Sequence, residues 1–120
     1  MKTTYHGVTA DDILVYAKRI ITEFGWQRMA WPAHGPCPRS IRAALAAATE
    51  DLMLPHTSDV HSEAIRRVSE AIYGRGSVGG INDWEHRKDT NKDAVIAMLQ
   101  RAIEMGPWPA ENANSGVWPT

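Results

Sequence analysis

Apolar residues recur every three or four positions in four segments of the chain, which is the spacing of one face of an α-helix. The first segment runs from about residue 9 to residue 24. Thr9 is a suitable capping residue, and Asp11 and Asp12 fall in the first turn, where carboxylates interact favourably with the helix dipole. Gly25 ends this helix. Its apolar stripe consists of Ile13, Leu14, Ala17, Ile20, Ile21 and Phe24.

A second helix is predicted from about Pro38 to Leu54. Proline is tolerated in a first helical turn, and Pro55 pushes the residue before it out of the helical region. The segment is rich in alanine, which leaves little side-chain bulk, so we expect this helix to pack closely in the middle of the bundle. Its stripe consists of Ile41, Ala44, Leu45, Ala48 and Leu52.

The third predicted helix runs from about residue 59 to residue 73. Ser58 or Asp59 is its capping residue, and Gly74 terminates it. Its stripe consists of Val60, Ala64, Ile65, Val68, Ala71 and Ile72.

The fourth predicted helix runs from about residue 91 to residue 105. Thr90 and Asp93 resemble a capping box at its start, and Gly106 ends it. Its core positions are Val95, Met98, Leu99, Ala102 and Ile103.

These patterns contain no convincing strand, so the sequence predicts an all-α fold. We expect a compact four-helix domain over residues 1–105, followed by an irregular tryptophan-containing tail over residues 106–120. Two connections, 25–37 and 74–89, are longer than the roughly 2–8 residues usual between bundle helices. Because long loops in compact domains are functional or mobile, candidate sites are sought there first.

The composition is that of an ordinary globular domain, with 43% hydrophobic and 22% charged residues. A formal net charge of -1 argues against binding to nucleic acid, including through Arg39, Arg42, Arg66 and Arg67. No apolar run approaches the roughly 18 residues that a membrane span needs, so no membrane partner is expected. The single cysteine excludes an intramolecular disulfide and favours a reducing, cytoplasmic location.

The five tryptophans all fall in the connections or the tail. One interpretation is that they cover the ends of the helical core, because tryptophan buries a large area while its N–H stays near water. The alternative is an aromatic surface for a protein partner, since tryptophan is enriched at binding hot spots. These residues are Trp26, Trp31, Trp84, Trp108 and Trp118.

Candidate catalytic residues occur in both long connections. His34 and Cys37 lie just before the second helix, where the helix dipole favours the thiolate form of a cysteine. Cys37 could then act as a nucleophile, with His34 as the base that takes its proton. Alternatively, Cys37 is a small buried side chain. In the other connection, Asp83 and His86 are the candidates, although Asn82 and Asp83 could instead bind nearby backbone amides and fix the loop.

An anion site is a further possibility at the start of the second helix. Arg39 and Arg42 share a helix face near its positive end and, with Arg87, could bind a phosphate or carboxylate. The alternative is a solvated face paired with acidic residues.

Metal and cofactor sites are not predicted. His56 and His61 are five positions apart, which does not align them on one helix face, and paired ligand motifs are missing. The segment 74–79 matches the pattern G-x-G-x-x-G, but a dinucleotide site needs a strand before the glycines and a helix directly after them. We therefore interpret this segment as a flexible connection.

Several features also occur together in a characteristic order: the segment 20–26 (IITEFGW), Cys37 before Ala44 and Leu45, Asn82 and Asp83 before Arg87, and the segment 95–103 (VIAMLQRAI). Over about residues 11–104 the chain thereby resembles an uncharacterised family of actinobacterial and actinobacteriophage domains of unknown function. The resemblance implies a small intracellular protein of an actinobacterium or its phage, located in the host cytoplasm in the second case. It implies no activity.

The hypothesis that follows is a non-enzymatic interaction module with a protein partner, which would be a host protein if the chain is phage-encoded. A homodimer formed through one helix face is a second possibility. The alternative function is a small enzyme or a ligand- or anion-binding domain, with its site at the start of the helix after His34 and Cys37 and in the loop 82–87.

Overall fold

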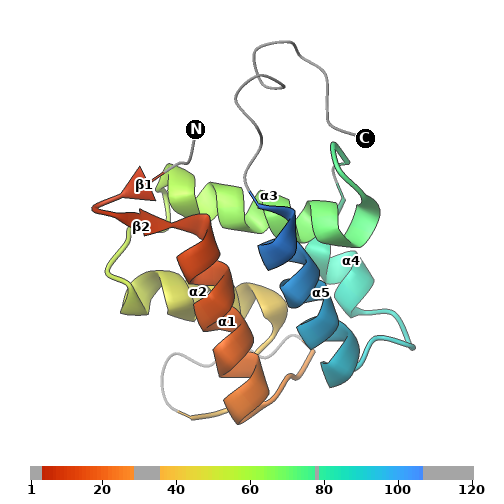
Figure 1. Cartoon of the computed structure of the whole chain (residues 1–120). Coiled ribbons are helices and arrows are strands. Elements are labelled where there is room, and N and C mark those ends of the chain that lie inside the picture. The colour runs from red at the N-terminus through yellow and green to blue at the C-terminus, as the bar shows by residue number, and fades with distance from the viewer. Residues whose placement is uncertain (1–3, 29–35, 78, 107–120) are drawn as a thin grey trace.

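The computed structural model describes residues 4–28, 36–77 and 79–106. Its elements are β1 (Thr4–Tyr5), β2 (Val8–Thr9), α1 (Ala10–Phe24), α2 (Ile41–Asp51), α3 (Asp59–Tyr73), α4 (Ile81–Glu85) and α5 (Lys92–Met105). The helical architecture confirms the predicted all-α fold, and the four predicted helices are α1, α2, α3 and α5 (Figure 1). The short α4, inside the second long connection, was not predicted.

The central helix of the fold is α1, which packs against α2, α3 and α5. The expectation that the alanine-rich helix lies in the middle is therefore wrong, because α2 makes most of its contacts with α1. The predicted stripes form one continuous core around α1. Its fully buried larger side chains include Ile13, Leu14, Ile21, Ile41, Leu45, Val60, Val68, Val95, Met98 and Leu99.

The chain enters α1 through a small antiparallel hairpin in which Tyr5 pairs with Val8. His6 and Gly7 form the turn, with φ angles of 50° and 81°. Positive φ at both central residues gives the twist that a tight hairpin needs. Strands of two residues are too short to show an alternating pattern, which is why the sequence did not reveal them. Thr9 then caps α1, in a full capping box with Asp12.

The start of α2 lies later than predicted. Ser40 is the N-cap, and its hydroxyl accepts a hydrogen bond from the amide of Ala43. Pro38 is outside the helix, because the next residue, Arg39, pairs with Trp26 in a parallel bridge. This pairing ties the first long connection back onto the end of α1.

The end of α2 lies earlier than predicted, at Asp51. The amide of Leu54 donates to the carbonyl of Thr49 and the amide of Met53 donates to that of Glu50. These two bonds form a Schellman motif, with Met53 in the left-handed conformation at φ 62°. Pro55 therefore follows a helix that has already ended.

Two smaller expectations also need correction. The N-cap of α5 is Asn91, which accepts from the amide of Ala94 at 2.8 Å, and not Thr90. Phe24, placed in the core stripe of α1, is 38% exposed. It is the last residue of the helix, where its side chain is partly open to solvent.

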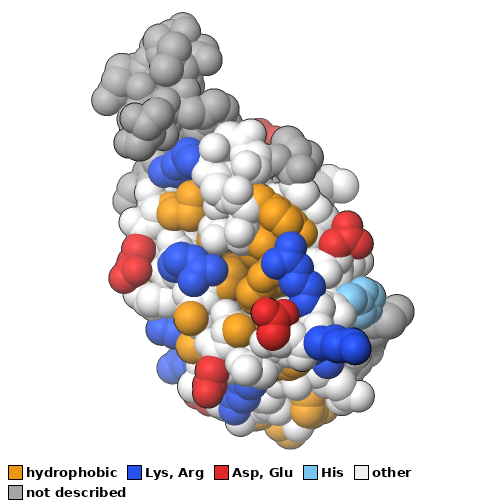
Figure 2. All heavy atoms as spheres, turned by 90° about the vertical axis from the view of Figure 1, so that its right-hand side faces the viewer, with side chains coloured by type: hydrophobic (Ala, Val, Ile, Leu, Met, Phe, Trp, Pro, Cys, Tyr) orange, Lys and Arg blue, Asp and Glu red, His pale blue; other side chains and the backbone are white. Residues whose placement is uncertain are grey.

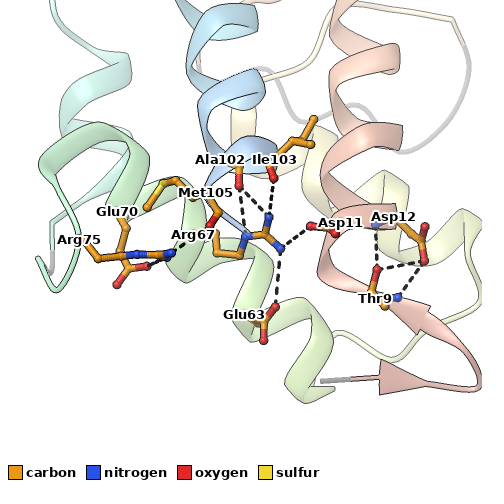
Figure 3. Close-up of polar contacts among 10 residues, drawn as sticks. All are labelled: Thr9, Asp11, Asp12, Glu63, Arg67, Glu70, Arg75, Ala102, Ile103 and Met105. Atoms are coloured by element: carbon orange, nitrogen blue, oxygen red, sulfur yellow. Dashed lines mark hydrogen bonds and ion pairs between the residues drawn. The ribbon is translucent and has the colours of Figure 1, made fainter. Parts of the chain in front are cut away.

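The last turn of α5 carries no basic residue of its own, and its carboxyl end is held by Arg67 of α3 and by Arg75, which follows the end of α3. Arg67, only 1% exposed, donates to the carbonyls of Ala102 and Ile103 and forms an ion pair with Asp11 at 2.6 Å. Arg75 donates to the carbonyl of Met105 (Figure 3). Positive charge at a helix C-terminus is favourable, so these contacts lock α3 against α5 and α1.

None of the helices in the described ranges combines the length and the apolar character needed to cross a membrane.

Candidate functional site

A groove of about 520 Å³ runs between α1 and α2. The α1 wall comes from residues at helical spacing, Tyr16, Arg19, Ile20, Glu23 and Phe24; the opposite wall comes from Ala47, Glu50 and Asp51, with Pro36 and Arg39 at one end. On α2, Ala47 has only a methyl group to fill the space between the helices. This small side chain leaves room for the groove.

Apolar and charged groups alternate along the groove. Ile20 is almost fully buried, whereas Phe24 is 38% exposed, so an apolar surface is open to solvent there. At the rim, the hydroxyl of Tyr16 donates to Asp51 at 2.9 Å and Arg19 pairs with Glu23 at 3.6 Å. The hydrogen bond to Asp51, with a smaller effect of burial, raises the pKa of Tyr16 above its usual value. Tyr16 is therefore a neutral donor at physiological pH.

The predicted catalytic candidates do not form a catalytic arrangement among the residues that the structure describes. Asp83 and His86 are exposed, and no hydrogen bond or ion pair joins their side chains to another described residue. Cys37 is half-buried, and its carbonyl accepts from Arg39 at 3.3 Å. His34 lies outside the described residues, so its pairing with Cys37 stays a prediction.

The loop 82–87 is held by groups other than the predicted side chains of Asn82 and Asp83. The hydroxyl of Thr90 donates to the carbonyl of Trp84. The guanidinium of Arg28 reaches across from the first connection and donates to the carbonyls of Glu85, Arg87 and Thr90 at 2.6–2.9 Å. The two long connections are therefore bound to each other, although not by the residues that the sequence indicated.

Glu85 is the main residue that the sequence analysis missed. This residue is 2% exposed, and one carboxylate oxygen accepts hydrogen bonds from the indole N–H of Trp26 at 2.6 Å and from the amide of Ile41 at 2.8 Å. Ile41 is the first residue of α2. The carboxylate of Glu85 is therefore bound at the N-terminus of α2, where the sequence analysis placed an anion. A signal was present, because Glu85 follows the apolar Ile81 by four positions and so shares its helix face.

The three arginines of the predicted anion site occupy different environments. Arg39 is 5% exposed, whereas Arg42 and Arg87 are exposed. Anion binding by these residues stays a prediction. Of the additional arginines considered for nucleic acid, Arg67 is buried in the ion-pair cluster of Figure 3 and cannot reach a phosphate backbone.

Two of the five tryptophans fall within the described residues. Trp26 and Trp84 are partly buried and pack against the core, and the N–H of Trp26 is bound by Glu85. Both therefore fit the interpretation that tryptophans cover the core. Trp31, Trp108 and Trp118 lie outside the described residues, as does the tail from residue 107 onward.

The face of the molecule that carries α4 has mixed polarity. Figure 2 shows hydrophobic areas there that are separated by lysine and arginine side chains, with carboxylates scattered among them. Interspersed charges of both signs are typical of a solvated surface.

The described glycines at the end of the glycine-rich segment are hydrogen-bonded to α3, and the flexibility expected of this connection stays a prediction. The hydroxyl of Ser69 both donates to and accepts from the backbone of Gly79, and the hydroxyl of Tyr73 donates to the carbonyl of Gly80 at 2.8 Å. A side chain at Gly79 would lie 2.3 Å from the ring of Tyr73. This glycine thus permits close packing of the loop on α3.

His56 and His61 come together, contrary to the expectation from their spacing. His56 lies in the connection before α3 and His61 in its first turn, and their ring centroids are 5.2 Å apart. Even so, within residues 4–28, 36–77 and 79–106 no three histidine, cysteine or acidic side chains form a group that could hold a metal ion.

Comparisons with known proteins give a family and no activity. A family model described as a family of unknown function (DUF6197) matches residues 6–105. The comparisons with curated proteins and with solved structures found no match.

Proposed function

The chain belongs to the DUF6197 family of unknown function, and we propose that it is a protein-interaction module that holds a partner segment in the groove between α1 and α2. The observation that carries this proposal is the exposed apolar side chain of Phe24, which lines the groove together with the partly buried Ala47. Removal of such a surface from water is the main driving force of most protein association.

The charges around the groove favour a partner segment that carries a cation beside its apolar side chain. Three carboxylates line the groove, those of Glu23, Glu50 and Asp51. Of the two arginines, Arg39 is buried and Arg19 already faces Glu23. The carboxylates of the lining outnumber its arginines by one, so a lysine or arginine of the partner would meet a small excess of negative charge. Such rim charges act mainly on specificity and association rate.

The enzyme alternative has less support from the described residues. The exposed positions of Asp83 and His86 favour a solvated loop, and the carboxylate of Glu85 is engaged in holding Trp26 and α2. If the chain is phage-encoded, we expect the partner to be a host protein of the bacterial cytoplasm. A second copy of the chain remains the competing occupant of the groove.

Selection from a displayed library of random peptides tests the proposal without a known partner. We expect the purified protein to enrich peptides in which an apolar residue lies next to lysine or arginine. The variant Ala47→Gln, which places a longer helix-forming side chain in the groove, should lose them. Val15→Ser is the matched control, because Val15 is an exposed residue of α1 that does not line the groove.

Two results would refute the proposal. One is the absence of enriched peptides from a library that is functional against a known binder. The other is enrichment of the same peptides by wild type and by Ala47→Gln. Sedimentation of the free protein tests whether a second copy of the chain fills the groove. A stable dimer of wild type that is absent in Ala47→Gln would identify a second copy as the occupant.

A further inference from the structure

The end of the groove at which Phe24 lies is built from two segments that are separated in sequence. Phe24 is the last residue of α1, whereas Pro36 and Arg39 come from the approach to α2. Two backbone hydrogen bonds form a junction between these segments, from the amide of Arg39 to the carbonyl of Gly25 at 3.3 Å and from the amide of Gln27 to the carbonyl of Arg39 at 3.2 Å. Both are longer than the usual distance of about 2.9–3.0 Å, so they alone hold the junction weakly.

The carboxylate of Glu85, at the end of α4, reinforces this junction. One of its oxygens accepts the indole N–H of Trp26 at 2.6 Å and the amide of Ile41 at 2.8 Å. Trp26 pairs with Arg39 in the parallel bridge, and Ile41 follows Arg39 by two positions. The same oxygen therefore binds both segments. Because hydrogen bonds to a charged acceptor are about twice as strong as neutral ones, the carboxylate is the firmer of the two links.

Arg28 in turn fixes the backbone of Glu85 beside the junction. Its guanidinium lies over the ring of Trp26, with 5.1 Å between Cζ and the ring centroid. Its Nε donates to the carbonyl of Glu85 at 2.9 Å, and its Nη2 donates to the carbonyls of Arg87 and Thr90 at 2.6 and 2.9 Å. The end of α4 is therefore attached to the same tryptophan that the carboxylate of Glu85 binds.

Glu85 does not line the groove and is only 2% exposed, so it acts on a bound segment through the residues that it holds. A partner side chain placed against Phe24 needs this end of the groove to keep its width. A gap of about 0.5–1 Å already removes a quarter to a half of the van der Waals attraction between two atoms. Small shifts of Pro36 and Arg39 relative to Phe24 would therefore weaken binding.

We propose that Glu85 is a positioning residue for partner binding, which keeps the Phe24 end of the groove in its binding arrangement by joining Trp26 to the start of α2. This inference rests on the proposed function of the groove. It gives the short helix α4 a role in binding, although none of its residues, 81–85, lines the groove.

A double-mutant cycle with one selected peptide tests this role. Fluorescence anisotropy gives the dissociation constant for wild type, Glu85→Gln, Phe24→Ser and the double variant. Glutamine keeps the shape of the side chain and removes the charge of the acceptor. We expect Glu85→Gln to weaken binding at least about fivefold in wild type but less than about twofold in Phe24→Ser, because the effects of two residues that act through one another do not add.

A purely stabilising role of Glu85 would not produce this pattern. Loss of stability alone leaves the dissociation constant unchanged as long as nearly all of the protein stays folded, which urea unfolding of each variant checks. Glu104→Gln is the matched control, because it makes the same change of charge at an exposed residue of α5 that does not line the groove. It should bind the peptide as wild type does.

Amide exchange measures the junction itself and needs no peptide. In Glu85→Gln, the amides of Gln27 and Arg39, which bond across the junction, should exchange at least about threefold faster than in wild type. The amide of Gly25, which donates to Ile21 within the last turn of α1, should be unchanged.

The two measurements separate failure of the positioning role from failure of the proposed function. Unchanged exchange at both junction amides, equal binding by wild type and Glu85→Gln, or a full additional loss in the double variant would overturn the positioning role and leave the groove as a binding site. A wild type that binds no peptide refutes the proposed function, and the positioning role falls with it. If Glu85→Gln fails to fold, Trp26→Phe takes its place, because it removes the indole N–H and leaves the bond from Ile41 to Glu85.

Discussion

Removal of the buried guanidinium of Arg67 should be among the most damaging single changes in this fold. Its nitrogens donate to the carbonyl of Ala102 at 3.2 and 2.8 Å and to that of Ile103 at 3.0 Å, and pair with Asp11 at 2.6 Å. Arg67→Met would fill most of the volume but would leave these two carbonyls and the carboxylates of Asp11 and Glu63 without their cation.

The expected loss follows from those contacts. Breaking a buried ion pair by removing one partner costs about 3–5 kcal/mol. Because the whole domain has a stability of roughly 5–15 kcal/mol, the variant should be marginally folded. Asp11 keeps 36% of its side chain exposed, which favours the lower half of the range. Arg67→Lys retains the charge but not the planar fork, so we expect an intermediate loss.

Urea unfolding followed by circular dichroism measures these losses. Arg19→Met is the matched control, because Arg19 is 70% exposed and pairs with Glu23 within one helix, an arrangement worth under about 0.5 kcal/mol. A loss for Arg67→Met below about 1 kcal/mol, or one equal to that of Arg19→Met, would refute the role assigned to this cluster.

Three further variants follow from the structure. Met53→Gly should raise stability by about 1 kcal/mol in urea unfolding, because Met53 is 88% exposed and glycine relieves its left-handed backbone; an unchanged or lower midpoint would contradict the Schellman end of α2. Gly79→Ala should lower the thermal midpoint and cost about 1–3 kcal/mol, because its Cβ would collide with the ring of Tyr73. Glu85→Gln should cost about 1–3 kcal/mol and change the fluorescence of Trp26, since the indole loses a charged acceptor; identical emission spectra would argue against this bond in solution.

Much of the helical architecture was predictable because its signals are local. Thr9 and Gly25 mark both ends of α1, and the three- and four-residue spacing identifies the buried face. The hairpin and α4 were missed because elements of two and five residues are too short for a strand or helix pattern to repeat. The start of α2 could have been recognised from Ser40, because serine is a preferred capping residue. Its end depends on a left-handed Met53, which residue preferences do not indicate.

The polar interior was less predictable, because a charged residue is buried only where distant partners meet it. Glu85 is held by Ile41, 44 positions away, and Arg67 by Ala102, 35 positions away. Charged residues are usually exposed, so nothing in the composition singled out these two. Arg67 does lie three and seven positions after Ala64 and Val60, on the apolar face of α3, and that position was an available signal.

The groove was not predicted at all. Phe24 was assigned to the core by its spacing, and the alanines of α2 were interpreted as a means of close packing. The alanines at 43, 44, 46 and 48 are buried as that interpretation expects, whereas Phe24 and Ala47 line the groove. An open surface depends on where two helices diverge, which the apolar pattern of each helix does not contain.

The most direct measurement of the central claim is the dissociation constant of one selected peptide for wild type, Phe24→Ser and Val15→Ser, by fluorescence anisotropy. Both variants remove an exposed apolar side chain from α1, but only Phe24 lines the groove. The interaction proposal predicts that Phe24→Ser weakens binding at least about tenfold, or 1.4 kcal/mol, while Val15→Ser leaves it within about twofold. Equal dissociation constants for the two variants would contradict it.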